Sequence, residues 1–187
     1  DTAENHTGGN SEIISGSTKS NIRKDIFLAT KVSPENLRYG DVLKSCEMSL
    51  SRLDTDYIDL YYIHWPNSAI PIEETCGALS SMIKNHGMIR YVGLSNFTLE
   101  QIKEAYNILG DKIIAIQSEY NPIERSVEKD IIPFCVSHDM MFVAYSPIKY
   151  IEYMSYDSKF ILSWLISHDN VFAIAKSLNK SHIDENV

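Results

Sequence analysis

Long apolar runs are missing from this sequence of 187 residues. Its longest uncharged stretches, such as 113–117 and 140–148, fall well short of the roughly 20 apolar residues that a membrane-spanning helix needs. No secretory leader opens the sequence either. We therefore expect a soluble, cytoplasmic protein with no membrane partner.

An excess of basic residues is also missing. Lys and Arg number 17 against 25 Asp and Glu, which gives a formal net charge of −8 at pH 7. A negatively charged protein does not attract nucleic acid or an anionic membrane over long range. We expect the partner to be a small molecule and not a nucleic acid, while the oligomeric state stays open.

Cysteine is scarce and follows no pattern. Cys46, Cys76 and Cys135 form no C-x-x-C pair and no even-numbered framework. Because a free cysteine usually behaves as a small hydrophobic residue, we expect all three to be buried or half-buried in helices. No spacing of ligands predicts a metal site. Three histidines without such spacing are expected at the surface: His86, His138 and His168.

Apolar, β-branched or aromatic runs alternate with stretches of helical periodicity. Six short runs recur about every 30 residues, and each leads to a polar residue. They are 26–30, 58–63, 91–94, 113–116, 141–144 and 171–174. Apolar residues between the runs lie on single helical faces, and helix starts are indicated at Thr98 and Ser126. This alternation is typical of a βα architecture with a parallel sheet.

Two architectures suit such a chain, an open doubly wound sheet and a closed (β/α)8 barrel. An open dinucleotide-binding sheet normally carries G-x-G-x-x-G after its first strand, whereas Gly8 and Gly9 follow no recognisable strand. The barrel is therefore favoured, and the carboxyl ends of its strands open on one rim. The polar residues that end the six runs would gather there: Lys31, His64, Ser95, Gln117, Tyr145 and Lys176.

Seven ordered blocks carry the motifs of a known family. They are D-T-A-E with G, S-E and G over 1–16, A-T-K-V at 29–32, L-D-T-D-Y-I-D-L-Y-Y-I-H-W-P at 53–66, G-M-I-R-Y-V-G-L-S-N-F at 87–97, Q-S-E-Y-N-P at 117–122, A-Y-S-P at 144–147, and I-A-K-S with H-I-D-E-N over 174–186. In these blocks the sequence resembles the aldo-keto reductase family. The resemblance implies a (β/α)8 barrel as a single domain over residues 1–187. It also implies an NAD(P)H-dependent enzyme that passes hydride to an aldehyde or ketone.

The resemblance assigns Asp1, Lys31 and His64 to three positions of the family's catalytic tetrad. The fourth position holds His6, where the family has tyrosine. In the family the tyrosine donates the proton, the lysine lowers its pKa, the aspartate holds the lysine, and the histidine orients the carbonyl. Trp65 corresponds to a residue that lines the substrate pocket.

A histidine in place of the tyrosine changes the acid chemistry. A phenol of pKa ~10 is protonated at pH 7, whereas an imidazole of pKa ~6.5 is mostly neutral there. A neighbouring lysine cation lowers the pKa of the imidazole further. We expect weak carbonyl reduction with an acid-shifted optimum and with cofactor binding retained. The alternative is that His6 turns to solvent and another residue or water donates the proton.

The nicotinamide end of the cofactor is assigned by the resemblance to residues on three strand ends. Ser95, Asn96 and Gln117 correspond to contacts of the carboxamide, which needs both donors and acceptors. Tyr145 corresponds to the aromatic platform under the ring, and Ser146 follows it among the cofactor-binding residues.

The adenosine end is assigned to the last block of the sequence. Lys176 and Ser177 correspond to contacts of the 2′-phosphate, and Glu185 and Asn186 to contacts of the adenine. A lysine at the phosphate favours NADP over NAD. NAD stays possible, because His182 stands where the family often has arginine.

Parts of the family pattern are missing. Nothing matches the first barrel strand, and the second strand is represented only by its end at Asp1. The stretch between Pro147 and Trp164 is shorter than the family's cofactor loop and the helix after it. Six strands cannot close an eight-stranded barrel, so we expect an incomplete barrel or a sequence from which segments have been left out.

The sequence supports two functions. The leading one is an NADPH-dependent carbonyl reductase with an altered proton donor. The rival is a catalytically silent, NADP(H)-binding redox sensor or regulatory subunit, which His6 and the short cofactor loop favour. A purely structural barrel is disfavoured by the polar rim. An NADPH titration followed by an aldehyde assay separates these three.

Overall fold

The computed structural model describes residues 1–18, 22–153, 156–177 and 179–185. The chain forms two compact units, Asp1–Ile114 and Ala115–Val187, and each is described by itself. The expectation of a single domain over residues 1–187 stays a prediction.

Three parallel strands form the sheet of the first unit: β1 (Ala29–Val32), β2 (Ile58–Ile63) and β3 (Ile89–Ser95). Their register places Lys31 opposite Tyr62, and Tyr62 opposite Gly93. Every residue of β1 and β2 is buried, as expected for parallel strands that are covered on both faces.

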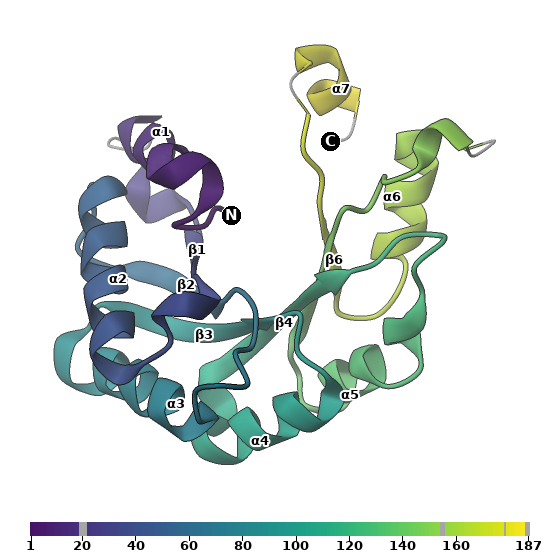
Figure 1. Cartoon of the computed structure of the whole chain (residues 1–187). Helices are drawn as coiled ribbons and strands as arrows, with labels where there is room; N and C mark the ends of the chain where they lie inside the picture. The colour runs from purple at the N-terminus through teal and green to yellow at the C-terminus, as the bar shows by residue number, and fades with distance from the viewer. Residues whose placement is uncertain (19–21, 154–155, 178, 186–187) are drawn as a thin grey trace. The chain divides into compact units, whose positions relative to one another are not determined.

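The first four residues extend this sheet beyond β1. The backbone N–H of Thr2 donates to the carbonyl of Ala29 at 3.0 Å, and that of Glu4 donates to the carbonyl of Lys31 at 3.2 Å. The segment therefore runs alongside β1, where Figure 1 shows the N-terminus. This pairing brings Asp1 next to the strand that carries Lys31.

Helices α2 (Tyr39–Arg52), α3 (Ile72–Ser81) and α4 (Leu99–Leu109) lie side by side along one face of this sheet (Figure 1). Each turns its apolar stripe inwards, for example Ile102 and Ala105 of α4. Thr98 begins α4 with a capping box to Gln101, as its position in the sequence predicts. The remaining elements are α1 (Asn10–Thr18), a π-helical turn at Met82–His86, and 3₁₀ turns at His6–Gly9, Arg23–Asp25, Pro34–Asn36 and Gly110–Lys112.

The second unit repeats the strand and helix alternation. Its parallel strands are β4 (Ile113–Glu119), which begins two residues before the unit does, β5 (Met141–Tyr145) and β6 (Val171–Ile174). Its helices are α5 (Ile131–Ser137), α6 (Ser158–Ile166) and α7 (Lys180–Glu185), with 3₁₀ turns at Ser126–Glu128 and Ile151–Tyr153. All six predicted strands are therefore confirmed as strands.

Two predicted elements begin three or more residues later than expected. The strand predicted from Ile26 begins at Ala29; the N–H of Leu28 just before it donates to the Asp59 carboxylate and not to the backbone of a neighbouring strand. The helix predicted from Ser126 begins at Ile131. The Ser126 side chain binds the Glu124 carboxylate, so it caps no helix, and a single 3₁₀ turn forms there.

The three cysteines are buried in α2, α3 and α5, which confirms that prediction. His86 and His138 are exposed as expected, but the prediction for His168 is wrong. The ring of His168 is half-buried against Tyr120, with the ring centroids 5.9 Å apart. Among the described residues, no helix is long and apolar enough to cross a membrane, and no cluster of His, Cys, Asp and Glu could hold a metal ion.

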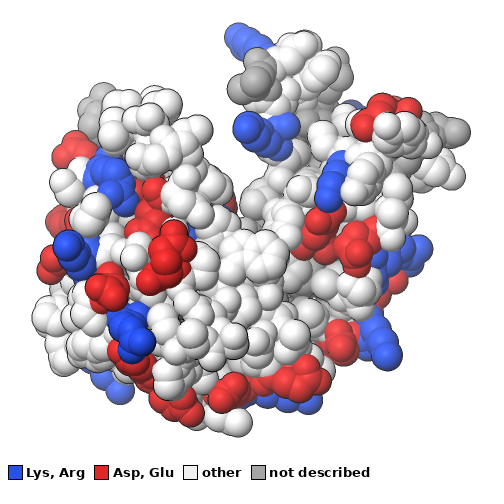
Figure 2. Space-filling model, in the orientation of Figure 1, with Lys and Arg blue, Asp and Glu red and all other residues white. Residues whose placement is uncertain are grey.

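Acidic and basic side chains are interleaved over the helices of the first unit on the face shown in Figure 2. One acidic side chain of this unit is instead completely buried. Glu12 of α1 accepts hydrogen bonds from the hydroxyl of Thr30 and from Nε of Arg52, both at 2.6 Å. One turn later, Gly16 lets α1 approach the end of α2, because a Cβ there would lie 2.7 Å from the Arg52 carbonyl oxygen.

We expect Glu12→Ala to lower the free energy of unfolding by about 3 kcal/mol, because it leaves a partly buried guanidinium and a buried hydroxyl without their partner. Urea denaturation measures the change. Glu47→Ala, at an exposed position of α2, is the matched control and should stay within about 0.5 kcal/mol. Equal losses from the two substitutions would contradict this account of Glu12.

Candidate active site

Polar side chains end or follow all three strands of the first unit. Lys31 is the last residue but one of β1, His64 follows β2, and Ser95 is the last residue of β3. The strands are parallel neighbours, and the N–H of His64 donates to the carbonyl of Val32 at 3.0 Å. The three residues therefore lie at the same edge of the sheet, as the sequence predicts for this part of the rim.

Lys31 is buried and makes an ion pair with Asp1. Its ammonium also donates to the carbonyl of Thr2 at 3.0 Å, so the segment beside β1 supplies both oxygen ligands. Burial lowers the pKa of the Lys31 ammonium from 10.5 to about 7. The Asp1 carboxylate opposes this change, because an opposite charge in contact favours the ammonium form. Lys31 is thus poised between its charged and neutral states near neutral pH.

His64 is half-buried beside this pair. Burial, followed by the positive charges of Lys31 and His6, lowers the pKa of the His64 imidazole from 6.5 to about 4, with Glu4 acting in the opposite direction. The ring is therefore neutral at pH 7. Its Nδ1 is buried and has no hydrogen-bond partner among the described residues. A neutral imidazole can donate a hydrogen bond to a carbonyl oxygen without carrying charge into the site.

His6 lies against His64 at the start of the first 3₁₀ turn. The two ring centroids are 5.6 Å apart, and the ring planes meet at 76°, an edge-to-face arrangement. The side chain of His6 is exposed, so a proton can reach it from solvent. The structure thus brings together all four residues that the resemblance assigns to the tetrad, while their roles stay predictions.

Asn96 ties the end of β3 to His64. Its Nδ2 donates to the carbonyl of His64 at 2.9 Å and to the Ser95 hydroxyl at 3.0 Å. Its backbone is left-handed, with φ of 64°, which an asparagine tolerates better than most residues do. Ser95 is buried, and Trp65 beside His64 exposes 48% of its surface. An exposed indole in this place is available to line a substrate pocket.

The remaining predicted residues belong to the second unit. Gln117 is buried on β4, Tyr145 ends β5 half-buried, and Ser146 follows it. Register pairs Glu119 with Tyr145 and Tyr145 with Ile174, so these strand ends are neighbours.

The adenosine-end residues follow β6 in the same unit. Lys176 is exposed, and the hydroxyl of Ser177 donates to the carbonyl of Asn179 at 3.2 Å. Glu185 is the last residue of α7, and Asn186 lies outside the described residues. Their cofactor roles stay predictions.

Tyr62 and Gly93 lie next to Lys31 but were not among the predicted site residues. The Lys31 ammonium lies over the ring of Tyr62, 5.4 Å from its centroid, and the ring packs on Gly93. The sequence held only part of this signal: side chains alternate along a strand, but the register of β1 and β2 decides that Tyr62 and not Tyr61 lies opposite Lys31.

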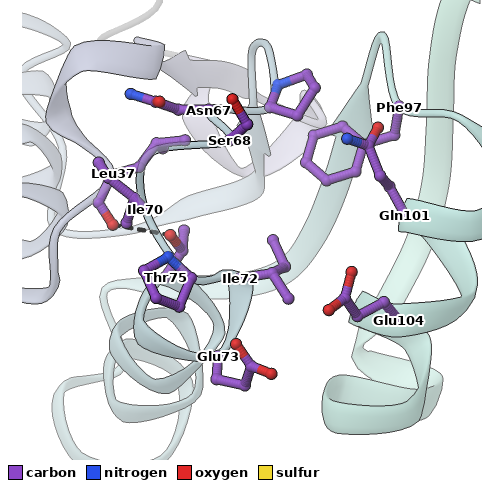
Figure 3. Close-up of a pocket in the computed structure, with 12 residues that line it drawn as sticks. Leu37, Asn67, Ser68, Ile70, Ile72, Glu73, Thr75, Phe97, Gln101 and Glu104 are labelled. Carbon is purple, nitrogen blue, oxygen red and sulfur yellow. Dashed lines mark hydrogen bonds between the residues drawn. The ribbon is translucent and has the colours of Figure 1, made fainter.

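A cavity of about 350 Å³ lies between α3, α4 and the loop that follows Trp65 (Figure 3). Gln101 and Glu104 reach it from α4, and Thr75 on its wall donates to the carbonyl of Leu37 at 2.8 Å. None of the predicted site residues lines this cavity. It is therefore separate from the strand-end site.

The sequence is similar to those of known proteins. The sequence model described as the aldo/keto reductase family matches residues 1–150. Methylglyoxal reductase YeaE of Escherichia coli strain K12 is 32% identical over 205 residues, which cover 100% of this chain and 72% of that protein.

Solved structures extend the likeness to the fold. A thermostable aldo-keto reductase, Tm1743, solved with the inhibitor epalrestat, is 38% identical with a TM-score of 0.92, covering 100% of this chain and 74% of that one. An aldo/keto reductase from Klebsiella pneumoniae, solved with NADP and acetate, is 29% identical with a TM-score of 0.92, covering 100% of this chain and 72% of that one. These likenesses confirm the fold class, part of a (β/α)8 barrel. The chain belongs to the aldo/keto reductase family.

Proposed function

We propose that this protein reduces an aldehyde or ketone to the alcohol with NADPH, and that His6 supplies the proton. The observation that carries the proposal is the contact of Asp1 with Lys31 beside the paired rings of His6 and His64. This constellation offers a hydrogen-bond donor for a carbonyl oxygen, an acid to protonate it, and a buried cation to tune that acid.

The residues present suit a nicotinamide cofactor by their chemistry. Ser95 and Asn96 offer a hydroxyl and an amide at the end of β3, and Gln117 offers a second amide on β4, which match a carboxamide that both donates and accepts. Lys176 is an exposed cation that suits the 2′-phosphate of NADP. NADPH, when bound, supplies the hydride that the carbonyl carbon takes up.

The proton steps fall to two histidines. Neutral His64 donates a hydrogen bond to the carbonyl oxygen and polarises the C=O bond. Protonated His6 then transfers its proton to that oxygen as the carbon is reduced, and His6 is left as the neutral imidazole. The Lys31 cation destabilises the imidazolium form of His6 by charge repulsion. The imidazolium is therefore a stronger acid, but a smaller fraction of His6 is protonated at pH 7. The proposed rate is therefore low at neutral pH and higher in mild acid.

A catalytically silent NADP(H)-binding sensor is the second candidate. His6 supports it, because a neutral imidazole at pH 7 has no readily released proton. The proposed partner is in either case a small molecule, a carbonyl compound or the nucleotide alone. We propose the cytoplasm as the compartment, and the net charge of −8 argues against nucleic-acid binding.

Fluorescence titration with NADPH, followed by turnover of an aldehyde panel from pH 5 to pH 8, tests the proposal. The panel includes methylglyoxal, which the name of the Escherichia coli relative suggests. Binding with turnover that rises towards acid pH supports the reductase. Binding without turnover selects the sensor, and the absence of binding rejects both.

Lys176→Ala should raise the dissociation constant of NADPH by about tenfold and leave that of NADH nearly unchanged, because a charge-assisted contact with phosphate is worth about 1.5 kcal/mol. Fluorescence titration with both nucleotides measures the change. Lys180→Ala removes an equally exposed cation from α7 and serves as the control. A parallel loss of affinity for both nucleotides would place Lys176 elsewhere than at the 2′-phosphate.

A further inference from the structure

Three residues on neighbouring strands form one layer beneath the Asp1 carboxylate. The register sets Lys31 of β1 opposite Tyr62 of β2, and Tyr62 opposite Gly93 of β3. The Lys31 ammonium lies 5.4 Å from the centroid of the Tyr62 ring, within the range of a cation–π contact. The ring itself is 1% exposed, so water does not compete for the ammonium from that side.

Gly93 fixes the place of this ring. A Cβ at position 93 would lie 2.3 Å from two carbons of the Tyr62 ring, far inside van der Waals contact. Only a residue without a side chain leaves room for the ring in this place. The ring is thus held from below by the backbone of one strand while it faces the lysine of another.

The ammonium has ligands of two kinds. The Asp1 carboxylate and the Thr2 carbonyl accept its hydrogen bonds, and both belong to the short segment that runs beside β1. The Tyr62 ring belongs to the central strand of the unit. An aromatic face attracts a cation by its quadrupole and accepts no proton, so it restrains the ammonium without neutralising it.

We propose that Tyr62 is a positioning residue of the reductase site: its aromatic face, held in place by Gly93, keeps the Lys31 ammonium against Asp1. The proposal rests on the proposed function only through the role of Lys31. Burial lowers the pKa of Lys31 to about 7, so a small change in the stabilisation of the cation decides how much of it is charged at neutral pH. The other charged and titratable groups beside this ammonium are the carboxylate of Asp1 and the ring of His64.

The test varies the electrons of the ring and keeps its shape. Tyr62→Phe retains the aromatic face, and Tyr62→3,4,5-trifluorophenylalanine retains the volume but weakens the quadrupole. The pKa of Lys31 is measured by NMR on lysine labelled at the side chain. We expect the fluorinated ring to lower the pKa of Lys31 by about one unit relative to Tyr62→Phe.

The kinetic consequence is specific to pH. A Lys31 pKa lower by one unit reduces the charged fraction at pH 7 by about fivefold and hardly changes it at pH 5. In the His6→Tyr protein, where the Lys31 cation stabilises the phenolate, the fluorinated variant should therefore reduce aldehyde about fivefold more slowly than Tyr62→Phe at pH 7, with the deficit lost at pH 5. A deficit that is the same at both pH values would overturn the proposal, as would an unchanged Lys31 pKa.

Tyr61→Phe is the matched control. Tyr61 is the next residue of the same strand and equally buried, and its hydroxyl has no hydrogen-bond partner among the described residues. We expect this substitution to leave the pKa of Lys31 unchanged. If the fluorinated ring shifts that pKa but the parent protein reduces no carbonyl compound, the proposed function fails while the placement of Lys31 by Tyr62 stands. Gly93→Ala gives an independent check, since the displaced ring should shift the pKa in the same direction.

Discussion

His6→Tyr should raise kcat/KM for aldehyde reduction at pH 7 by about 10²-fold, the lower end of what general acid catalysis contributes. The phenol is protonated at this pH, whereas the imidazole it replaces is mostly neutral. The Lys31 ammonium lies in the same site and stabilises the phenolate that remains after proton transfer. Initial rates at saturating NADPH, measured from pH 5 to pH 9, give the value. The acid-shifted optimum of the parent protein should give way to activity that persists at neutral pH.

His86→Tyr makes the same chemical change at an exposed position and should alter nothing. NADPH affinity should be alike in all three proteins, because His6 is assigned to the carbonyl and not to the cofactor. Brisk reduction by the parent protein at pH 8, with no gain from His6→Tyr, would remove His6 from the mechanism. The proton would then come from another residue or from water.

In the His6→Tyr protein, Lys31→Met should lower kcat/KM for aldehyde reduction by about 10²-fold. The loss follows because the substitution removes the cation that tunes the proton donor. Methionine fills nearly the same volume as lysine, so urea denaturation shows whether the kinetic loss is separate from a loss of structure. Steady-state kinetics and urea denaturation on the same preparation measure the two effects.

Lys44→Met, at an exposed position of α2, is the control for the loss of a positive charge. It should change neither activity nor stability. If the Lys31→Met protein unfolds at a much lower urea concentration, the ion pair of Lys31 with Asp1 holds the segment 1–4 in place. The kinetic loss would then result from misplacement of the residue at position 6. A Lys31→Met protein with unchanged kinetics would rule out the assigned role of Lys31.

The sequence predicted the strands well because a buried parallel strand has a local signature, a short apolar run that ends in a polar residue. The helix at Leu99 was equally clear from its capping box. The prediction at Ser126 failed because its hydroxyl had two possible partners. It binds the carboxylate of Glu124, two residues earlier, and does not cap a helix. Local patterns cannot rank such competing contacts.

The candidate site was predicted to a different extent for different residues. Asp1 and Lys31 are 30 positions apart, and only the family motif suggested their contact, which the structure contains. The buried pair of Glu12 and Arg52 has no such motif, and nothing in the sequence joins two residues across 40 positions. Tyr62 was hidden by its neighbour, because two adjacent tyrosines give the same composition whichever of them faces Lys31. Register, which depends on how the strands pair, settles that choice.

The close approach at Gly93 should couple the residue types accepted at two distant positions. A methyl group at position 93 has no room while position 62 holds a tyrosine. We therefore expect alanine at position 93 to be tolerated where position 62 holds a residue smaller than tyrosine. Alanine at 93 together with tyrosine at 62 should be disfavoured, because the methyl group and the ring would overlap. Among homologous chains, the sizes of these two residues should be inversely related, even though 31 positions separate them.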